Sequence, residues 1–157
     1  NHIPEVIEDK NTIEENAKKK AKECYKLFNL PVISDDSGLF VEILDGKPGV
    51  HSKRYAGENA TDAENNQKLI SEVKASDNVN ACFKTILCYF DGLNFIMSEG
   101  ILNGKIIFKP RGNNGFGYDP IFEVDGRTLA EMTLEEKSKL SHRKIAAVKL
   151  VEKLNEI

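Results

Sequence analysis

The sequence has 157 residues, of which 40% are hydrophobic, and this is enough for one domain with an apolar core. Its 22 basic and 25 acidic residues are spread along the chain and give a formal net charge of −3, so no polycationic tract is available for non-specific binding to nucleic acid. No apolar stretch approaches the roughly 18 residues of a membrane span, and no charged-then-apolar leader is visible. We therefore expect a single cytoplasmic domain over residues 1–157 that binds neither nucleic acid nor membranes.

The three cysteines, Cys24, Cys82 and Cys88, are odd in number, lie in apolar segments and lack C-x-x-C spacing. This pattern favours reduced thiols in the core over disulfides or a zinc site. Reduced thiols also agree with the expected cytoplasmic location.

The first predicted element is a helix over residues 12–29. Thr12 and Glu15 form a capping-box pattern, and apolar residues follow them at helical spacing. A short apolar run then predicts a strand over residues 31–36 that ends in a turn rich in Asp, Ser and Gly. A second strand is predicted over residues 39–44, so we expect the two strands to form a hairpin-like unit.

The remaining elements alternate between strands and capped helices. In chain order they are a helix that begins after Thr61 with Glu64, a strand over residues 80–90, an Asp91-Gly92 hairpin turn, strands over residues 93–97 and 100–108, a loop over residues 110–120, a strand over residues 121–124, a short helix capped by Thr133 and a final helix capped by Ser141. The hairpin turn indicates an antiparallel section of sheet. Asn103-Gly104 predicts a turn or a bulge within its strand.

Asp35 and Asp36 are the most informative residues, because two adjacent carboxylates stand where the predicted strand ends. Adjacent acids repel each other, and a buried charge without a partner is costly, so such a pair needs hydrogen-bond donors, water or a cation. Together with Glu15 they offer the few carboxylates that Mg²⁺ accepts beside water and phosphate oxygens. The alternatives are that the pair lies in a solvated turn and that Glu15 only caps its helix. The residues alone leave both interpretations open.

Two further groups suit a ligand that carries a flat ring and phosphates. The loop Arg111–Asp119 contains glycines that allow close approach to its backbone, and aromatic rings that offer stacking faces. It has neither the Gly-Lys-Ser/Thr of a Walker loop nor a dinucleotide fingerprint. Lys137, His142 and Arg143 cluster where a helix begins, and donors at such a position favour anions and acceptor-rich ligands. The alternatives are a mobile surface loop and a solvated helix start.

Taken together, these segments resemble the inosine triphosphate pyrophosphatase family, the dITP/XTP pyrophosphatases that remove non-standard purine nucleotides. The matching segments are Thr12-Ile13-Glu14-Glu15-Asn16-Ala17, Ser34-Asp35-Asp36-Ser37-Gly38, Pro48-Gly49-Val50-His51-Ser52-Lys53-Arg54-Tyr55-Ala56-Gly57, Gly115-Phe116-Gly117-Tyr118-Asp119-Pro120, and Glu136-Lys137-Ser138 with Ser141-His142-Arg143. They span nearly the whole chain in the family's order, which makes them far more specific than any single motif. The resemblance implies an α/β fold in which helices flank a mixed, twisted central sheet and a nucleotide cleft separates two lobes.

The resemblance also implies a homodimer that uses Mg²⁺ to hydrolyse a nucleoside triphosphate between its α and β phosphorus atoms. The family's metal ligands correspond to Glu15 and Asp36. Asp36 is also the implied proton acceptor, although a carboxylate bound to a metal is a poorer base. Asp35 is the second candidate for catalysis, and Ser37 is a candidate donor to a phosphate oxygen. A cation that bridges phosphate oxygens would neutralise developing charge and orient the attacking water.

The nucleotide contacts follow from the same resemblance, and the implied bases are hypoxanthine and xanthine. By family position the contacts are Phe116, Gly117, Tyr118, Asp119, Lys137, His142 and Arg143. Phe116 is suited to stack on the base. A 6-oxo group accepts hydrogen bonds where the 6-amino group of adenine donates them, so donors such as His142 or Arg143 select the oxo purines.

The sequence departs from the family pattern at its beginning. Family members start with a strand and a Ser/Thr-x-x-Asn-x-x-Lys segment that grips the phosphates, and this sequence starts after that point. If this is the entire molecule, we expect severely reduced triphosphate affinity and turnover. One alternative is therefore a non-catalytic nucleotide-binding or dimerisation domain. A haloacid-dehalogenase-type phosphatase is a second alternative, disfavoured because the acidic segment lacks Asp-x-Asp spacing.

Overall fold

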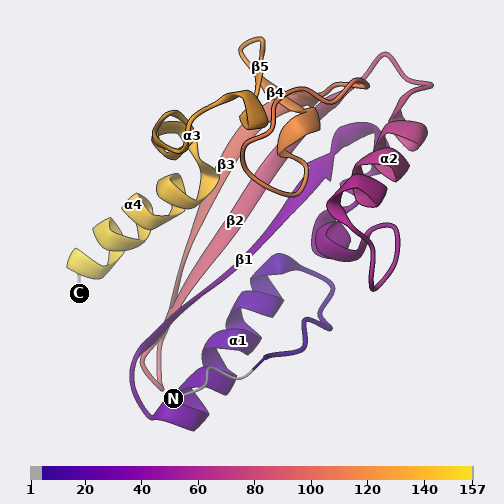
Figure 1. Ribbon diagram of the computed structural model, residues 1–157. Coiled ribbons are helices and arrows are strands. Elements are labelled where there is room, and N and C mark those ends of the chain that lie inside the picture. Colours follow the sequence, from indigo (N-terminus) through magenta and orange to yellow (C-terminus); the bar gives the residue numbers. More distant parts are fainter. Residues whose placement is uncertain (1–4, 157) are drawn as a thin grey trace.

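A five-stranded sheet forms the centre of the computed structural model, which describes residues 5–156. The strands are β1 (Val32–Val41), β2 (Asn80–Phe90), β3 (Phe95–Ile106), β4 (Phe122–Val124) and β5 (Arg127–Thr128). They lie side by side in chain order, three long strands followed by two short ones (Figure 1). Each described strand is antiparallel to its neighbour. The expected α/β class is confirmed, but this part of the sheet is antiparallel and not mixed.

Helices and short 3₁₀ turns connect and cover these strands. In residues 5–156 they are α1 (Ile13–Phe28), η1 (Glu42–Leu44), η2 (Gly49–Arg54), α2 (Asp62–Val73), η3 (Asp119–Ile121), η4 (Leu129–Glu131), α3 (Leu134–Leu140) and α4 (His142–Asn155). The side chains of Thr12, Thr61, Thr133 and Ser141 each accept a backbone N–H at a helix start, so the predicted caps are confirmed. None of the described helices is long and apolar enough to cross a membrane.

β1 is one continuous strand, so the predicted hairpin-like unit is wrong. Asp35 lies opposite Leu87 and Asp36 opposite Ile86 in an unbroken register with β2. Asp, Ser and Gly favour turns because their backbone or side chains find local partners there. Here β2 supplies the partners, so pairing with the neighbouring strand overrides the local preference. The acidic pair therefore lies in the middle of a strand and not at its end.

The two strands predicted after the hairpin turn are a single strand, β3. The turn itself is confirmed, because Asp91 Oδ1 accepts the backbone N–H groups of Leu93 and Asn94. Asn103-Gly104 forms neither a turn nor a bulge, since Gly104 lies in the regular ladder. A Cβ atom at Gly104 would lie 2.6 Å from the ring of Phe122. The glycine is explained by this close approach of a buried ring.

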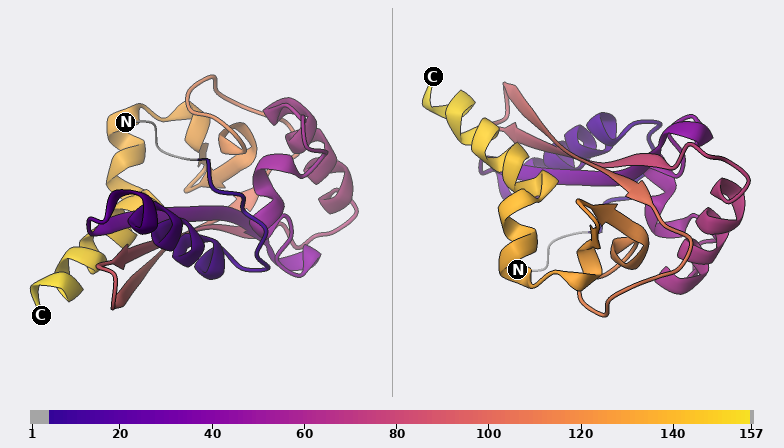
Figure 2. Two further views of the ribbon diagram at one scale, coloured as in Figure 1. Left: turned by 90° about the horizontal axis from the view of Figure 1, so that it is seen from below. Right: turned by 90° about the horizontal axis from the view of Figure 1, so that it is seen from above.

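α1 and α4 cover opposite faces of the long strands (Figure 2). From β1, Ser34 donates its hydroxyl hydrogen to the carbonyl of Ala17 in α1 at 2.6 Å. From β3, Ser98 donates to the carbonyl of Ala146 in α4 at 2.7 Å. Because successive side chains of a strand point to opposite faces, the even-numbered residues of β1 face α1 and the odd-numbered residues face α4.

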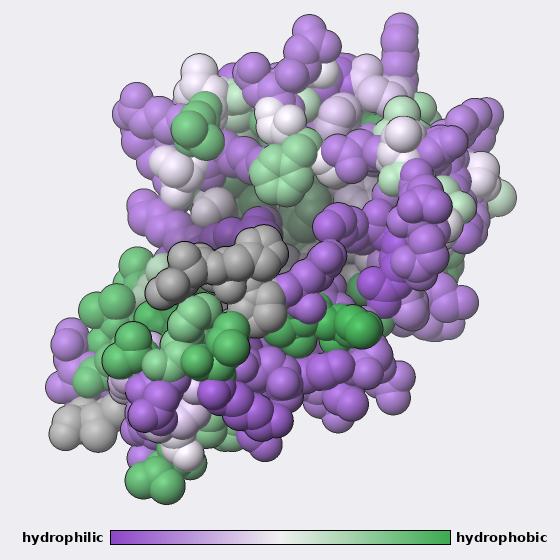
Figure 3. Space-filling model, turned by 60° about the horizontal axis from the view of Figure 1, so that its bottom comes forward, coloured by the Kyte–Doolittle hydropathy of each residue, from purple (hydrophilic) through white to green (hydrophobic). Residues whose placement is uncertain are grey.

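Two apolar cores lie toward opposite ends of the long strands. The first core joins α1 to the end of β2 near the hairpin and contains Ile13, Ala17, Ala21, Ile86, Cys88 and Phe90. The second contains Leu39, Val41, Leu69, Val73, Ala81, Leu102, Ile106, Tyr118, Ile121, Phe122, Leu129 and Met132. The space-filling view is hollowed between the half that contains α1 and the half that contains α2 (Figure 3). The expected two-lobed arrangement agrees with these two cores.

The cysteines are free thiols, as the sequence predicts. Cys88 is buried in the core beneath α1, and burial raises the pKa of its thiol to about 11. A thiol with such a pKa stays protonated at neutral pH and is a poor nucleophile. The structure therefore assigns Cys88 to packing.

Candidate active site

Asp36 is a buried carboxylate on the face of β1 that α1 covers. It is 7% exposed, and its Oδ1 atom accepts the backbone N–H of Ser37 at 3.0 Å. Its other oxygen, Oδ2, is buried and accepts no hydrogen bond, although the side-chain amide of Asn16, also unpaired, lies close enough to lower the pKa of Asp36. Burial raises the pKa of Asp36 above its usual value, although the ammonium group of Lys20 opposes this shift. A cation or a donor would satisfy the free oxygen.

Lys20 and Glu8 form a cluster with Asp36, and neither was predicted. The Nζ atom of Lys20 lies 3.4 Å from Asp36 Oδ1 and 2.5 Å from Glu8 Oε1. It also donates to the backbone carbonyl of Asp35 at 2.9 Å. Burial lowers the pKa of Lys20, but the acids around it outweigh burial and leave that pKa raised. We call Asp36, Lys20 and Glu8 the carboxylate cluster.

Helical spacing holds a signal for Lys20 that could have identified it. Ile13, Ala17 and Ala21 form the buried face of α1, and Lys20 lies on the same side, three residues after Ala17. A lysine at such a position packs its stem on apolar surface and needs a partner for its charged end. Glu8 precedes the helix outside any motif, so its role depends on tertiary structure alone.

Glu15 bonds to Thr12, the residue that caps α1. Its carboxylate accepts the hydroxyl of Thr12 at 3.2 Å, and its backbone N–H donates to the same hydroxyl oxygen. The charge of Glu8 acts on Asp36 and raises its pKa. Among residues 5–156 no group of three or more His, Cys, Asp or Glu side chains is arranged to hold a metal. In this structure Glu15 bonds to Thr12, while Glu8 lies beside Asp36 through Lys20.

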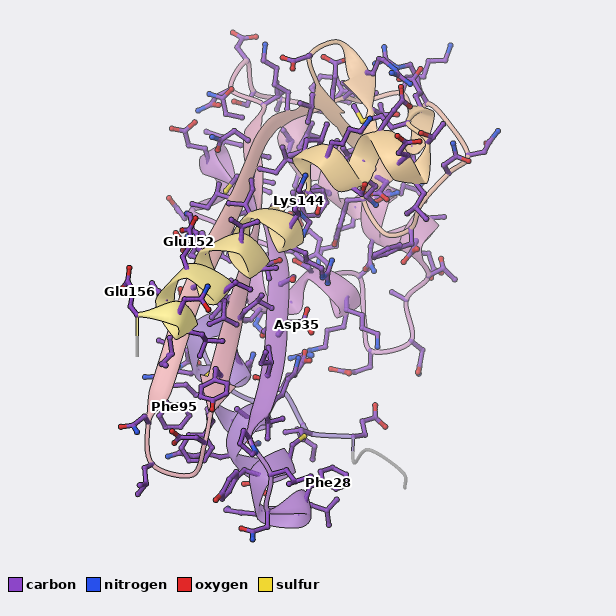
Figure 4. All side chains as sticks on the ribbon, turned by 90° about the vertical axis from the view of Figure 1, so that its left-hand side faces the viewer. Phe28, Asp35, Phe95, Lys144, Glu152 and Glu156 are labelled. Carbon is purple, nitrogen blue, oxygen red and sulfur yellow. The ribbon has the colours of Figure 1, made fainter. Side chains whose placement is uncertain are left out.

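Asp35 faces the other side of the sheet. Its Oδ2 atom accepts Nε–H of Arg143, in the first turn of α4, at 3.3 Å. Both side chains are 49% exposed, so solvent weakens this ion pair. Asp35 lies on β1 beside α4 (Figure 4). The two neighbouring carboxylates therefore do not converge on one site.

Ser37 lies on the same face as Asp35. Its hydroxyl oxygen is 2.7 Å from the hydroxyl oxygen of Thr85, which is fully buried in β2. Either hydroxyl can donate in this pair. Ser37 can therefore donate to a phosphate oxygen only when its own hydrogen turns away from Thr85.

Asp119 organises the predicted nucleotide loop. This buried carboxylate accepts the backbone N–H of Phe116 at 3.0 Å and pairs with the ammonium group of Lys137. The same ammonium lies 4.8 Å from the centre of the Phe116 ring. Tyr118 is buried and donates its hydroxyl to the carbonyl of Ser52 at 2.7 Å. Phe116 is 67% exposed, so its ring can meet a ligand.

His142 begins α4 and is buried. Its ring stacks on that of Phe83, with centroids 5.1 Å apart and planes inclined by 12°, and its Nδ1 atom has no hydrogen-bond partner. Burial, together with the positive charges of Arg143 and Lys137, lowers the pKa of His142 to about 4, although Asp35 opposes the shift. The imidazole is neutral at pH 7, so its unpaired nitrogen can serve a neutral polar group of a ligand.

The structure divides the predicted residues into two clusters on either face of β1. The carboxylate cluster lies beneath α1. The second, which we call the nucleotide cluster, comprises Asp35, Phe116, Asp119, Lys137, His142 and Arg143, which contact one another near the start of α4, together with Gly117 and Tyr118 of the same loop and Ser37 on the same face of β1 as Asp35. A surface pocket of about 610 Å³ between η1, η2 and α2 contains none of these residues.

Comparison with known protein sequences links the chain to one family. The profile of the Ham1 family matches residues 1–153. The chain is 52% identical over 156 residues to the dITP/XTP pyrophosphatase of Caldanaerobacter subterraneus subsp. tengcongensis, which covers 96% of this chain and 78% of the relative. It is 51% identical over 147 residues to the dITP/XTP pyrophosphatase of Geobacter sulfurreducens, which covers 90% of this chain and 73% of the relative.

Solved structures share the fold described above. A HAM1 protein from Coxiella burnetii matches with a TM-score of 0.93 and 40% sequence identity, over 99% of this chain and 82% of that one. A nucleoside-triphosphatase, or dITP/XTP pyrophosphatase, from Mycobacterium abscessus matches with a TM-score of 0.82 and 38% identity, over 98% of this chain and 81% of that one.

Proposed function

The chain belongs to the Ham1 family, and we propose that it hydrolyses the non-standard purine triphosphates dITP, inosine triphosphate and XTP to the monophosphate and pyrophosphate. Relatives with 52% and 51% identity carry the name dITP/XTP pyrophosphatase. The observation that carries the proposal is the buried carboxylate of Asp36, which has one free oxygen and an ammonium group beside it. The nucleotide cluster lies on the opposite face of the same stretch of β1, so a substrate that uses both clusters would have to pass around this strand, which is at the edge of the described sheet.

The groups around Asp36 fit Mg²⁺. Mg²⁺ binds through one or two carboxylates together with water and phosphate oxygens. The free, buried Oδ2 atom of Asp36 offers one such ligand, and Glu8 lies across Lys20 from it. We assign Asp36 as the metal carboxylate and Glu8, in place of Glu15, as the second candidate. When bound, Mg²⁺ supplies charge neutralisation at the phosphate oxygens and orients the attacking water.

The side chains of the carboxylate cluster provide the remaining chemistry at the phosphates. Burial raises the pKa of Asp36, so without a bound cation it is a stronger base than an exposed aspartate, whereas bound Mg²⁺ would weaken it as a base. The ammonium group of Lys20 pairs with Glu8 and Asp36 in this structure, and phosphate oxygens of a substrate can replace these two partners. Ser37 lies on the opposite face of β1, so it could donate to a substrate oxygen only from the side of the nucleotide cluster, once its hydroxyl hydrogen turns from Thr85.

The nucleotide cluster provides recognition of the base. Phe116 offers an exposed ring for stacking, and Lys137 lies over that ring. His142 offers an unpaired ring nitrogen, and Arg143 can exchange its exposed partner Asp35 for a ligand oxygen. Because adenine would leave donors unpaired in such a site, we expect 6-oxo purines to be preferred.

We also propose that the protein acts as a homodimer in the cytoplasm, a proposal supported by family membership. Light scattering after size-exclusion chromatography measures whether the protein is a dimer. A particle of twice the chain's 17.6 kDa is expected. A single-chain mass at micromolar concentration would contradict the dimer.

The experiment that tests the function measures pyrophosphate release from inosine triphosphate, XTP and ATP, with and without Mg²⁺. We expect Mg²⁺-dependent release from the first two substrates, at least tenfold faster than from ATP. Orthophosphate as the product would instead support a phosphatase. Nucleotide binding without either product would support the non-catalytic alternative.

A matched pair of variants tests the assignment of the second carboxylate. Glu8→Gln should lower the rate of pyrophosphate release at least tenfold, because it removes a charge from the carboxylate cluster. Glu15→Gln keeps an oxygen that can accept the Thr12 hydroxyl and should leave the rate within about twofold. The reverse order would restore Glu15 as the metal ligand.

A further inference from the structure

Two side chains of α2 form hydrogen bonds with Gly117, which directly follows Phe116 in the predicted nucleotide loop. The backbone N–H of Gly117 donates to Asp62 Oδ2 at 2.7 Å. The carbonyl of the same residue accepts Nδ2–H of Asn66 at 3.1 Å. Both main-chain groups of Gly117 are thus bound by side chains one helical turn apart on one helix.

The helix that carries these two side chains is itself well anchored. Thr61 and Glu64 form a complete capping box at its first turn, next to Asp62. Asn66 is buried, and Leu69 and Val73 of the same helix lie in the second apolar core. α2 therefore offers a fixed support to the loop.

Phe116 depends on this support because no core packing holds its ring. The ring is 67% exposed, and its described contact is the ammonium group of Lys137 at 4.8 Å from the ring centre. Gly117 has a φ of +62°, a backbone conformation that other residues rarely adopt. The backbone that directs the Phe116 side chain is held on one side by Asp119, which accepts the Phe116 N–H, and on the other by the bonds of Gly117 to α2.

We propose that Asp62 and Asn66 are positioning residues that hold Phe116 ready to stack on the purine base, a role that rests on the function proposed above. An N–H donated to a carboxylate is among the stronger hydrogen bonds in proteins, and here it is made before substrate arrives. Ordering the loop in advance lowers the cost of binding the base. It leaves the chemistry at the phosphates unchanged.

Asp62→Ala and Asp62→Asn form the matched test. Both remove a charge from the first turn of α2, but the amide oxygen of Asn can still accept the Gly117 N–H. Asp62→Ala should raise KM for inosine triphosphate about tenfold and leave kcat within about twofold, whereas Asp62→Asn should stay within about threefold of wild type in both. Asn66→Leu, which removes the other bond, should raise KM in the same way. Equal effects of Ala and Asn at position 62, or a loss confined to kcat, would overturn the proposal.

A double-mutant cycle separates positioning from general damage to the fold. In a Phe116→Ala background, Asp62→Ala should change KM by less than about twofold, because the ring that it positions is gone. A full tenfold effect in that background would overturn the proposal. Amide hydrogen exchange measured across residues 115–119 should also be faster in Asp62→Ala than in Asp62→Asn.

The outcomes for this proposal and for the function are distinguishable. A wild-type chain that releases no pyrophosphate from any triphosphate overturns the function, and with it the role in substrate positioning. A wild-type chain that hydrolyses inosine triphosphate while Asp62→Ala and Asn66→Leu keep its KM overturns the positioning role alone.

Discussion

Asp35 and Asp36 are adjacent in the sequence but have different partners. Asp36 is held beneath α1 by Lys20, whereas Asp35 pairs with Arg143 of α4. The sequence identifies both acids as unusual, but their directions follow only once the segment is known to be a strand. The sequence does not decide the role of Glu15 either, because its bond to Thr12 and a role as metal ligand use the same carboxylate.

Lys137 allows a test of the nucleotide cluster in the absence of ligand. The ammonium group of Lys137 pairs with the buried carboxylate of Asp119. Without Lys137, that carboxylate would retain the backbone N–H of Phe116 as its donor. Lys137→Met should therefore lower the free energy of unfolding by about 3 kcal/mol in urea titrations. Lys139→Met is the control, since the pair of Lys139 with Glu135 is exposed and should contribute less than about 0.5 kcal/mol. Equal losses would contradict the buried pair.

His142 should make the stability depend on pH. Its pKa of about 4 in the folded state lies below the ordinary value of 6.5. Above pH 6.5 neither state carries the proton, but as the pH falls toward 4 the unfolded chain takes up a proton that the folded chain does not. The contribution of neutral His142 to the free energy of unfolding is therefore complete at neutral pH. It is lost as the pH falls, by about 3 kcal/mol in all.

His142→Phe provides the reference for this titration. The variant lacks the titrating group, so the difference in unfolding free energy between it and wild type should change by about 3 kcal/mol between pH 6.5 and pH 4. Urea titrations at four or five pH values across this window would measure it. A difference that stays constant would show that His142 titrates normally in the folded state.

At the scale of elements, local signals predicted the helices better than the strands. The cap residues Thr12, Thr61, Thr133 and Ser141 act within their own turn of backbone, so the sequence contains nearly all of the information that places them. The limits of β1 and β3 depend on partners far along the chain. Their Asp, Ser, Asn and Gly residues therefore gave false turn signals.

The packing of α4 on β3 is a second property that local sequence does not contain. A Cβ atom at Gly100 would lie 1.8 Å from the carbonyl oxygen of His142 and 2.6 Å from the nitrogen of Ala146. Gly100→Ala should push α4 away and cost about 3 kcal/mol of unfolding free energy. Ser98→Ala is the control at the same interface, since it removes one hydrogen bond and should cost about 1 kcal/mol. A smaller loss for Gly100→Ala than for Ser98→Ala would contradict this packing.

At the scale of the whole molecule, β1 contributes residues to both clusters. One cluster lies on each face of the sheet, and a different helix covers each face. The carboxylate cluster depends on α1, and the nucleotide cluster depends on α4 with the loop that α2 supports. The order of motifs in the sequence was enough to indicate the family. It could not indicate Glu8, Lys20 or Asp62, because these residues acquire their roles through contacts between elements.

The most direct test of this arrangement compares Asp36→Asn with Asp35→Asn in Mg²⁺-dependent pyrophosphate release from XTP. We predict that Asp36→Asn lowers kcat/KM at least about 100-fold, because it removes both the proposed metal ligand and the base. Asp35→Asn should stay within about tenfold, because its carboxylate faces α4 and only pairs with Arg143. An equal or larger loss from Asp35→Asn would contradict the assignment of catalysis to the face of β1 beneath α1.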